Sequence, residues 1–218
     1  MREKKHIGKR LVSLLTMSLL LSILFGMNAC AAKAPKFAKT AMLFSGNPES
    51  SGVMNSVKTD KILKLKSSNP KVVAVKKEFY CGEHNIKLIP KKAGTATISF
   101  TLKRKNGKTY SFKTKVKVYN YEKPVSKISI GKNDYTKLFN KEYINWVKAD
   151  PVIRGKLKIT MKKGFKLTGL YLVEGGTGKE KKIKNGSMIT LDATHYIRAE
   201  YKNTKKNYSY GIFLGGKQ

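Results

Sequence analysis

Alternation of apolar and polar residues, repeated in short segments along most of the chain, is the feature that most constrains the fold. In residues 110–119 (YSFKTKVKVY) lysines occupy positions 113, 115 and 117, and apolar or small residues take the positions between them. Successive side chains of a β-strand point to opposite faces, so such a segment has one wet face and one buried face. Short segments of this kind, separated by turns, predict an antiparallel all-β sandwich.

Turn-forming residues mark the ends of these segments. Asn106-Gly107 is the strongest hairpin signal, and Asn185-Gly186 is a second one. The glycine-rich segment 174–179 has only a superficial likeness to a phosphate-binding loop, because Glu180 follows Lys179 and no helical pattern comes after it. We interpret it as a hairpin turn. The single segment for which a helical turn is expected is 143–148.

Three sequence blocks in the first half occur in a fixed order, namely 67–70 (SSNP), 72–75 (VVAV) and 92–98 (KAGTATI). Together they resemble the bacterial immunoglobulin-like domain, group 2, over residues 37–119. The tryptophan often found ahead of the serine pair is missing, and residues 77–85 form a longer stretch than the family's glycine turn. The resemblance implies an immunoglobulin-like sandwich that serves as a spacer or adhesive module, and it transfers no ligand-binding residue.

The second half continues the strand pattern. Residues 120–124 are predicted to be a linker and residues 125–218 a second all-β domain. A second immunoglobulin-like sandwich is the favoured interpretation, and a faint resemblance to surface repeats with a β-grasp fold stays open beside it. The predicted fold class is therefore all-β: two tandem immunoglobulin-like β-sandwich domains after an N-terminal signal peptide.

The amino terminus has a positively charged head followed by a stretch, 11–32, that contains no charged residue. This pattern predicts a secretory signal peptide at residues 1–31. Ala29-Cys30-Ala31 fits a small-x-small cleavage site, whereas residues 27–30 loosely resemble a lipobox, in which Cys30 would carry a lipid. Free secretion is slightly favoured. The protein is expected to be extracellular, secreted or attached to the cell surface, and to meet the membrane only through the signal peptide or a lipid on Cys30.

The chain is strongly basic, with 46 Lys and Arg residues against 13 Asp and Glu residues and a formal net charge of +33. Such a charge favours non-specific contact with polyanions, for example cell-wall polymers. Sequence-specific binding of nucleic acid is not expected, because the arginines beyond the signal peptide are only Arg104, Arg154 and Arg198. The lysines are spread along the sequence, which favours a solvated surface over a dedicated polyanion site.

The sequence offers no motif for catalysis, metal binding or a cofactor. Zinc, calcium and phosphate-loop spacings are missing, so no catalytic residue, metal site or cofactor is predicted and an enzyme is not expected. Cys81 lies three residues before His84, and we interpret it as a buried small residue and not as a nucleophile.

An aromatic cluster is the candidate ligand surface: Tyr135, Phe139, Tyr143 and Trp146. Exposed, these rings would stack on a glycan or anchor a protein partner. The favoured interpretation places Trp146 in the core of the second domain. The expected function is that of a binding, adhesion or spacer module, and the alternative is carbohydrate or polyanion binding through residues 134–148.

Overall fold

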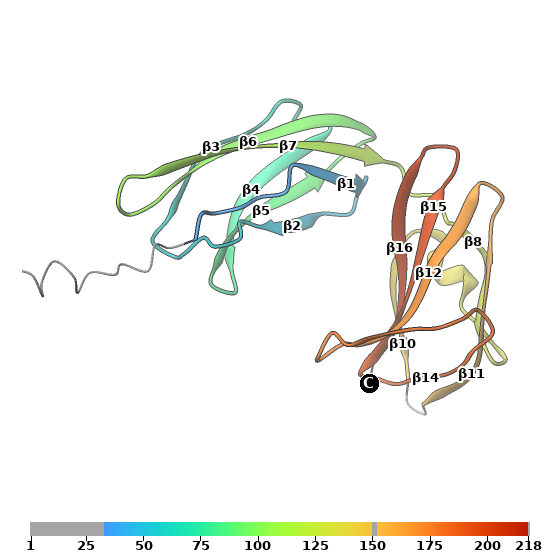
Figure 1. Ribbon diagram of the computed structural model, residues 1–218. Helices are drawn as coiled ribbons and strands as arrows, with labels where there is room; N and C mark the ends of the chain where they lie inside the picture. The colour runs from blue at the N-terminus through green and yellow to red at the C-terminus, as the bar shows by residue number, and fades with distance from the viewer. Residues whose placement is uncertain (1–32, 150–151, 218) are drawn as a thin grey trace, which may run out of the picture. The chain divides into compact units, whose positions relative to one another are not determined.

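The computed structural model describes residues 33–149 and 152–217, and nearly every element in them is a β-strand (Figure 1). The predicted signal peptide at 1–31, with Cys30, lies outside the described residues. The chain divides into two compact units, and the second begins at Tyr119. Among the described residues, none of the helical structure is long and apolar enough to cross a membrane.

The first domain is a sandwich of two sheets. Its strands are β1 (Thr40–Phe44), β2 (Glu49–Gly52), β3 (Lys61–Ser67), β4 (Val73–Tyr80), β5 (Glu83–Pro90), β6 (Gly94–Lys103) and β7 (Thr109–Tyr119). One sheet has the strand order β1-β7-β6-β3 and the other the order β2-β5-β4. The hairpins β4–β5 and β6–β7 each stay within one sheet, whereas the connections β1–β2, β2–β3, β3–β4 and β5–β6 cross between the sheets. This pattern of crossings is that of an immunoglobulin-like sandwich.

The core of the first domain is built from the inward residues of the alternating strands. On β6 these are Ala96, Ile98, Phe100 and Leu102, all at most 3% exposed. On β7, Thr114 shares the buried face with the valines, and its hydroxyl donates to the Ala38 carbonyl at 2.5 Å. The hydrogen bond satisfies a polar group that would otherwise be costly to bury. The alternation predicted for residues 110–119 is confirmed, because the lysines of this strand are all exposed.

Two hairpin tips of the first domain differ from expectation. The Asn106-Gly107 hairpin forms, but only Gly107 has a positive φ, +86°, because the loop spans Arg104 to Lys108 and is longer than a two-residue turn. The tip of β4–β5 is a two-residue turn in which Cys81 and Gly82 both have positive φ. Cys81 is exposed there, so its assignment as a buried residue was wrong. A residue at a hairpin tip extends beyond the sheet, and no second layer covers it.

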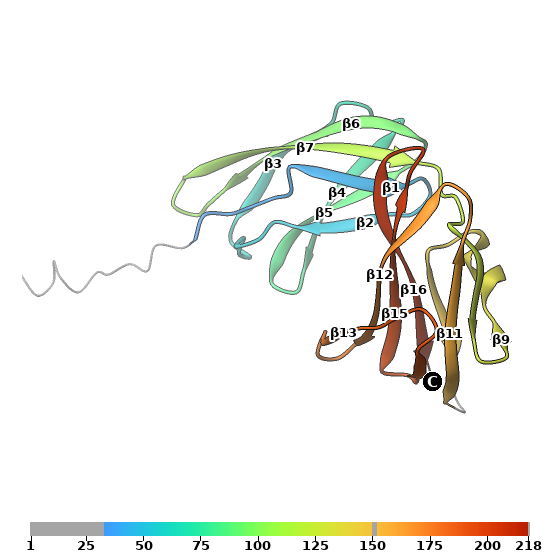
Figure 2. The same ribbon diagram turned by 45° about the vertical axis from the view of Figure 1, so that its right-hand side comes forward.

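The second domain is also a sandwich of two sheets. Its elements are β8 (Val125–Ile130), β9 (Asn133–Asp134), the 3-10 helix η1 (Thr136–Asn140), β10 (Ile144–Lys148), β11 (Ile153–Met161), β12 (Phe165–Glu174), β13 (Glu180–Lys182), β14 (Met188–Leu191), β15 (His195–Asn203) and β16 (Tyr208–Lys217). The sheets have the orders β10-β16-β15-β12-β13 and β14-β11-β8-β9 (Figures 1 and 2). This arrangement is again immunoglobulin-like and differs from a β-grasp fold, in which a helix packs on a single sheet. The chain thus consists of two tandem immunoglobulin-like β-sandwich domains.

The helical turn predicted at 143–148 is a strand. Residues 144–148 form β10, which pairs in parallel with residues 213–217 of β16. The helical element lies just before it, at η1. The backbone hydrogen bonds of β10 come from a partner about seventy residues away, and this long-range pairing overrides the local preference of a short segment.

Of the two hairpin turns predicted in the second domain, one forms and the other does not. Segment 174–179 is the predicted hairpin turn between β12 and β13, closed by the Glu174 N–H donating to the Lys179 carbonyl at 3.0 Å. Asn185-Gly186, however, does not form a hairpin, because the strands on either side of it belong to different sheets. The Asn185 side chain exchanges two hydrogen bonds with the backbone of Ile159, at 2.9 and 2.8 Å, and so takes the place of a strand partner.

An acid-sensitive turn precedes β15. The Asp192 carboxylate accepts hydrogen bonds from the N–H and the hydroxyl of Thr194 at 2.8 and 2.7 Å, and the His195 Nδ1 lies 2.8 Å from the same oxygen. The contact with His195, followed by those with Thr194, lowers the pKa of Asp192 from 3.8 to about 2. The ionised carboxylate therefore holds this turn.

We expect this turn to lose its stabilising effect in acid. The folded pKa of Asp192 lies below its unfolded value, so its contribution is fully present above about pH 4 and is lost as the pH falls toward 2. A carboxyl carbon titration followed by NMR should place the midpoint of Asp192 near pH 2. In Asp192→Asn this part of the pH dependence of unfolding should be missing, and a midpoint at 3.8 or higher would contradict the assignment.

Candidate functional site

Lysines and hydroxyl-bearing residues share the outer face of the four-stranded sheet in the first domain. We name this surface the lysine–hydroxyl face; it comprises Lys64, Lys66, Thr95, Thr97, Ser99, Thr101, Ser111, Lys113, Lys115 and Lys117. The residues of β1, β3, β6 and β7 are all described, and none of them is Asp or Glu. The face is therefore purely cationic.

The register of the strands distributes the charges evenly over this face. Lys113 of β7 lies opposite Ser99 of β6, and Lys115 lies opposite Thr97. Residues directly opposite each other on antiparallel strands share a face, so each of these lysines has a hydroxyl neighbour instead of a second cation. The arrangement avoids direct repulsion across the strands and sets hydrogen-bond donors between the charges.

A β-bulge in β3 brings a further lysine to the face. Leu63 pairs with Thr101 and Lys66 pairs with Ser99, so β3 has one more residue than β6 between these two pairs. Lys64 sits in the bulge with φ +52°. Simple alternation would turn Leu63 and Lys66 to opposite faces, and the extra residue returns Lys66 to the side of Leu63.

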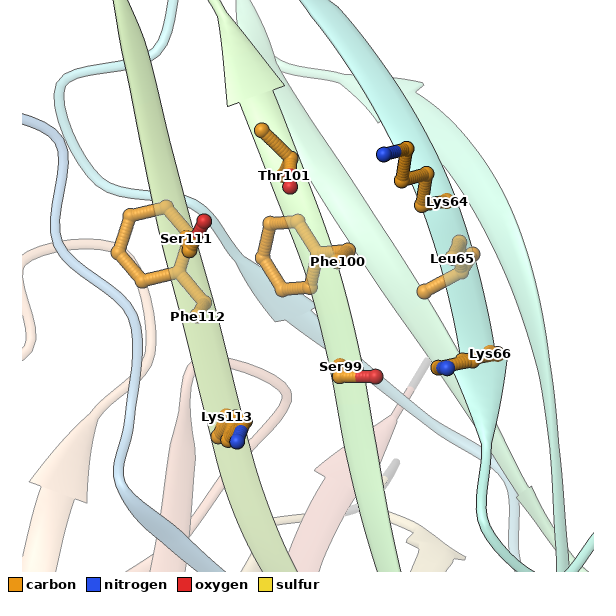
Figure 3. Close-up of a pocket in the computed structure, with 9 residues that line it drawn as sticks. All are labelled: Lys64, Leu65, Lys66, Ser99, Phe100, Thr101, Ser111, Phe112 and Lys113. Carbon is orange, nitrogen blue, oxygen red and sulfur yellow. The ribbon is translucent and has the colours of Figure 1, made fainter.

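These strands enclose a groove. It is lined by Lys64, Leu65, Lys66, Ser99, Phe100, Thr101, Ser111, Phe112 and Lys113. Figure 3 shows lysines of β3 and β7 at its two margins and the small hydroxyl residues of β6 between them. Within residues 33–149 and 152–217, none of these three lysines forms an ion pair. The groove combines mobile cations with fixed donors, which is suited to an anion with several oxygens.

Three of the four acidic residues described in the first domain, Glu49, Glu78 and Glu83, lie on the other sheet, and the fourth, Asp60, comes just before β3. Glu78 pairs with Lys87 at 3.0 Å and accepts a hydrogen bond from the Ser50 hydroxyl at 2.6 Å. The Ser50 hydroxyl, and after it Lys87, lowers the pKa of Glu78. The β1-β7-β6-β3 sheet thus carries lysines and no acid, whereas the β2-β5-β4 sheet carries Glu49, Glu78 and Glu83 together with Lys76, Lys77 and Lys87. The expectation of a solvated lysine surface stays a prediction, and the structure adds that the strands of one sheet of this domain carry no acidic residue.

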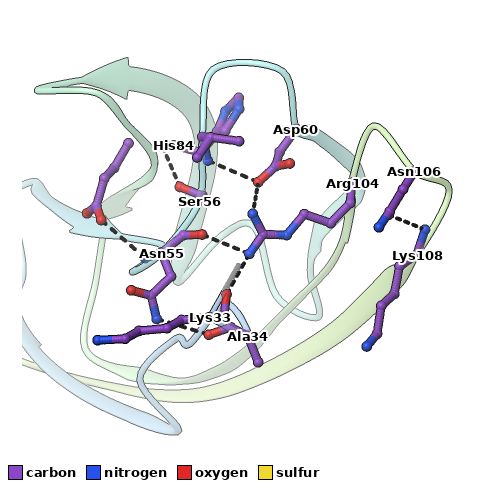
Figure 4. Close-up of polar contacts among 11 residues, drawn as sticks. Lys33, Ala34, Asn55, Ser56, Asp60, His84, Arg104, Asn106 and Lys108 are labelled. Carbon is purple, nitrogen blue, oxygen red and sulfur yellow. Dashed lines mark hydrogen bonds and ion pairs between the residues drawn. The ribbon is translucent and has the colours of Figure 1, made fainter. Parts of the chain in front are cut away.

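Arg104 follows β6 at the end of the lysine-bearing sheet, and its side chain forms a buried ion pair with Asp60. Its guanidinium lies 3.4 Å from the Asp60 carboxylate and donates to the carbonyls of Lys33 and Asn55 at 2.8 and 2.9 Å (Figure 4). The side chains of Arg104 and Asp60 are only 9% and 1% exposed. This buried pair joins the loop before β3 to the β6–β7 hairpin and is not available to a ligand.

The predicted aromatic cluster of the second domain does not form one surface. Phe139 and Tyr143 are 0% and 8% exposed and belong to the core, where the Tyr121 hydroxyl donates to the Phe139 carbonyl. Tyr135 is half-buried, and burial raises its pKa. Trp146 is 53% exposed, so its placement in the core was wrong. It lies on the outer face of β10, where no further layer covers the sheet.

The Trp146 ring lies across Gly215 of the neighbouring strand. The two residues are paired in register, and a Cβ on Gly215 would come within 2.1 Å of the ring. Beside them lie Ile144, Tyr196 and Phe213, which complete a small notch. Sequence reasoning missed Tyr196 and Phe213, because they join Trp146 only through the pairing of β10, β16 and β15.

Metal and nucleophile chemistry find no support in the described part of the chain. No group of three His, Cys, Asp or Glu residues there is placed to hold a metal ion. His84 packs edge-on against Phe79 with ring centroids 5.1 Å apart, while Cys81 stands at the exposed hairpin tip. No hydrogen bond joins Cys81 to His84 in these residues. The structure therefore does not bring the two together as a nucleophile and its base, the alternative that their spacing had suggested.

Of three comparisons with known proteins, only the one with solved structures finds similar proteins. No protein-family model matches the sequence, and no curated protein shows significant similarity to it. Among solved structures, the fibronectin(III)-like modules of Clostridium thermocellum CbhA share 11% identity over 85% of this chain and 95% of theirs, with a TM-score of 0.34. The Ig1-2 module of the Drosophila receptor protein tyrosine phosphatase DLAR shares 11% identity over 85% of this chain and 97% of its own, with a TM-score of 0.36.

An S-layer protein is also among the similar structures. Domains 5-6 of the S-layer protein SbsC share 10% identity over 85% of this chain and all of that chain, with a TM-score of 0.31. Because these TM-scores lie below 0.5, the assignment of the fold rests on the strand topology described above.

Proposed function

We propose that this protein is an exported, non-catalytic binding and spacer module of a bacterial cell surface, whose first domain holds an anionic polymer on the lysine–hydroxyl face. The difference in charge between the two sheets of the first domain carries this proposal, since one sheet presents lysines without any acid, whereas the other mixes lysines with Glu49, Glu78 and Glu83. The three sequence blocks between 67 and 98 support membership of the first domain in the bacterial immunoglobulin-like domain, group 2. The signal-like segment 1–31 supports an extracellular location.

The spacing of the lysines suits an extended polymer. Lys113 and Lys115 are two residues apart on one strand face, a distance of roughly 7 Å, and Lys66 extends the row across β6. A chain with repeating phosphate groups can contact several of these ammonium groups at once and accept hydrogen bonds from Ser99 and Thr97 between them. Lysine is a compact charge on a flexible stem, so it suits a repetitive ligand better than a fixed bidentate one.

Teichoic acids, the phosphate polymers of Gram-positive-type walls, are the ligands that this chemistry favours. Binding of this kind gains most of its free energy from the release of counterions, so it weakens steeply as salt increases. Mass spectrometry of the mature amino terminus tests the export step and distinguishes free secretion from attachment through a lipid on Cys30.

The triple variant Lys66→Ala, Lys113→Ala, Lys115→Ala tests the lysine–hydroxyl face. We expect at least a tenfold loss of affinity for purified teichoic acid at physiological salt, and a logarithmic salt slope that is smaller by about 2, because roughly 0.7–0.9 counterions are released per phosphate contact. Titration by calorimetry at several salt concentrations measures both quantities.

A matched triple variant in the second domain, Lys156→Ala, Lys158→Ala, Lys202→Ala, removes the same charge from exposed positions. It should bind teichoic acid nearly as well as the unaltered chain. Equal losses in the two variants would mean that net charge alone holds the polymer, and an unaltered chain that does not bind would refute the proposal outright.

A further inference from the structure

We propose that the outer face of the five-stranded sheet in the second domain is a separate site for a glycan, in which a hexopyranose ring stacks on Trp146 and a neighbouring sugar contacts Arg198 and Glu200. This inference goes beyond the proposed polymer binding and does not depend on it. It rests on the aromatic residues of β10, β15 and β16 and on the polar residues next to them.

Two aromatic rings on this face pack against glycines of β16. Trp146 covers Gly215, and the Phe213 ring lies over Gly211, where an added Cβ would come within 3.3 Å of it. Glycine inside a strand is costly because it weakens the sheet, and a ring laid over the bare backbone offsets part of that cost. Trp146 nevertheless remains 53% exposed, so much of its side chain is open to solvent. An exposed aromatic ring is what a sugar needs for stacking.

Two adjoining depressions on this face have opposite character. The first is the notch of Ile144, Trp146, Tyr196, Phe213 and Gly215, in which every lining residue is apolar or aromatic. The second is lined by Thr168, Arg198, Glu200, Ser209, Tyr210, Gly211 and Phe213. Phe213 lines both, so an apolar surface and a set of hydrogen-bonding groups lie side by side. Binding sites for small ligands commonly combine an apolar lining with a few placed polar groups.

The polar groups are held in place before any ligand arrives. Arg198 lies over the Tyr171 ring with its guanidinium 4.6 Å from the ring centre. It also pairs with Glu180 at 2.7 Å and with Glu200 at 3.5 Å. A guanidinium fixed by a ring and two carboxylates loses little freedom when it donates to a hydroxyl, and fixing it in advance favours binding.

The charges at this place favour a neutral glycan over an anionic polymer. Arg198 is matched by two glutamates, so the centre of the face offers no excess of positive charge, in contrast to the lysine–hydroxyl face. The slightly positive C–H groups of a pyranose ring complement the negative face of an indole, and its hydroxyls suit carboxylate and guanidinium partners. The ribbon-like β-1,4-linked oligosaccharides expose such C–H faces on successive rings, and they are the class of ligand that we infer.

Trp146 is the single tryptophan of the sequence, so it reports on its own site. Titration of the full chain with β-1,4-linked hexasaccharides of glucose and of N-acetylglucosamine should shift the tryptophan emission to shorter wavelength in a saturable manner with at least one of them. Trp146→Ala should weaken binding at least tenfold by calorimetry, and Trp146→Phe should restore part of it. Tyr80→Ala removes an aromatic residue that is 73% exposed in the first domain, and it should bind like the unaltered chain.

Glu200→Gln is a second test that does not depend on the folding of the Trp146 variants. It keeps the shape of the site and should still lower the affinity for the oligosaccharide severalfold. The triple variant Lys66→Ala, Lys113→Ala, Lys115→Ala should bind the oligosaccharides like the unaltered chain. Failure of the glycan proposal is therefore distinguishable from failure of the teichoic acid proposal. Saturable binding that survives Trp146→Ala would overturn the site, as would the lack of any response to both sugars. Concentration-dependent self-association that Trp146→Ala abolishes would also overturn it and would identify this face as a contact between two copies of the chain.

Discussion

Arg104→Met is expected to destabilise the first domain by about 3–5 kcal/mol. The substitution keeps much of the side-chain volume and removes the cation that lies 3.4 Å from Asp60. Asp60 is only 1% exposed, so its carboxylate would remain buried without its partner, and the carbonyls of Lys33 and Asn55 would lose their donor. Leaving one member of a buried ion pair alone costs more than the pair contributes, because the desolvation of the remaining charge is no longer compensated.

Chemical denaturation followed by two signals measures this effect. The only tryptophan belongs to the second domain, so its fluorescence follows that domain, whereas far-ultraviolet circular dichroism follows both. Arg104→Met should shift only the unfolding transition of the first domain, which circular dichroism detects and tryptophan fluorescence does not. Lys105→Met, an exposed neighbour in the same loop, should leave both transitions in place. Adding Asp60→Asn to Arg104→Met should recover part of the loss, and no recovery would mean that packing and not charge explains the effect.

Gly155→Ala is expected to destabilise the second domain by about 3 kcal/mol. Gly155 lies on β11 against Gly131, which follows β8, and an added Cβ would stand 2.5 Å from the Gly131 nitrogen and 2.6 Å from its Cα. Backbone atoms cannot move aside as a flexible side chain can, so the two strands would have to separate. The strands β8 and β11 are paired over residues 125–130, and their separation would open the sheet beside the buried Leu157.

The tryptophan transition reports this loss directly, because Trp146 is in the same domain. Gly176→Ala is the matched control, since Gly176 has no neighbour within 4 Å of an added Cβ and lies in the exposed β12–β13 turn. It should change the free energy of unfolding by no more than about 0.5 kcal/mol. If both glycine variants lose stability equally, close approach of the backbone is not the cause.

Strand segments with clear alternation could be predicted from the sequence. In β7, the pattern of lysines against small and apolar residues gave the correct buried face, because the side-chain period of a strand is a local property. The Asn106-Gly107 hairpin was also predicted, although its loop is longer than the two-residue turn that this dipeptide favours. The candidate aromatic site was only partly foreseen, since Trp146 is exposed while Phe139 and Tyr143 fill the core.

Other features depended on contacts that no local pattern records. The bulge between Leu63 and Lys66 depends on how β3 pairs with β6, and it decides on which face of the sheet Lys66 lies. The strand at 144–148 exists because β16 supplies its hydrogen bonds, and Tyr196 and Phe213 meet Trp146 for the same reason. Such pairings join residues far apart in the chain.

The amino-acid sequence by itself determined that this chain forms short amphipathic strands and which side of most of them is wet. The tertiary structure alone decided which strands are neighbours, and so placed a set of lysines without acids on one sheet of the first domain and the Trp146 notch on one sheet of the second. The physical reason is that side-chain alternation is fixed within a strand, whereas the order of strands in a sheet depends on the packing of the whole domain.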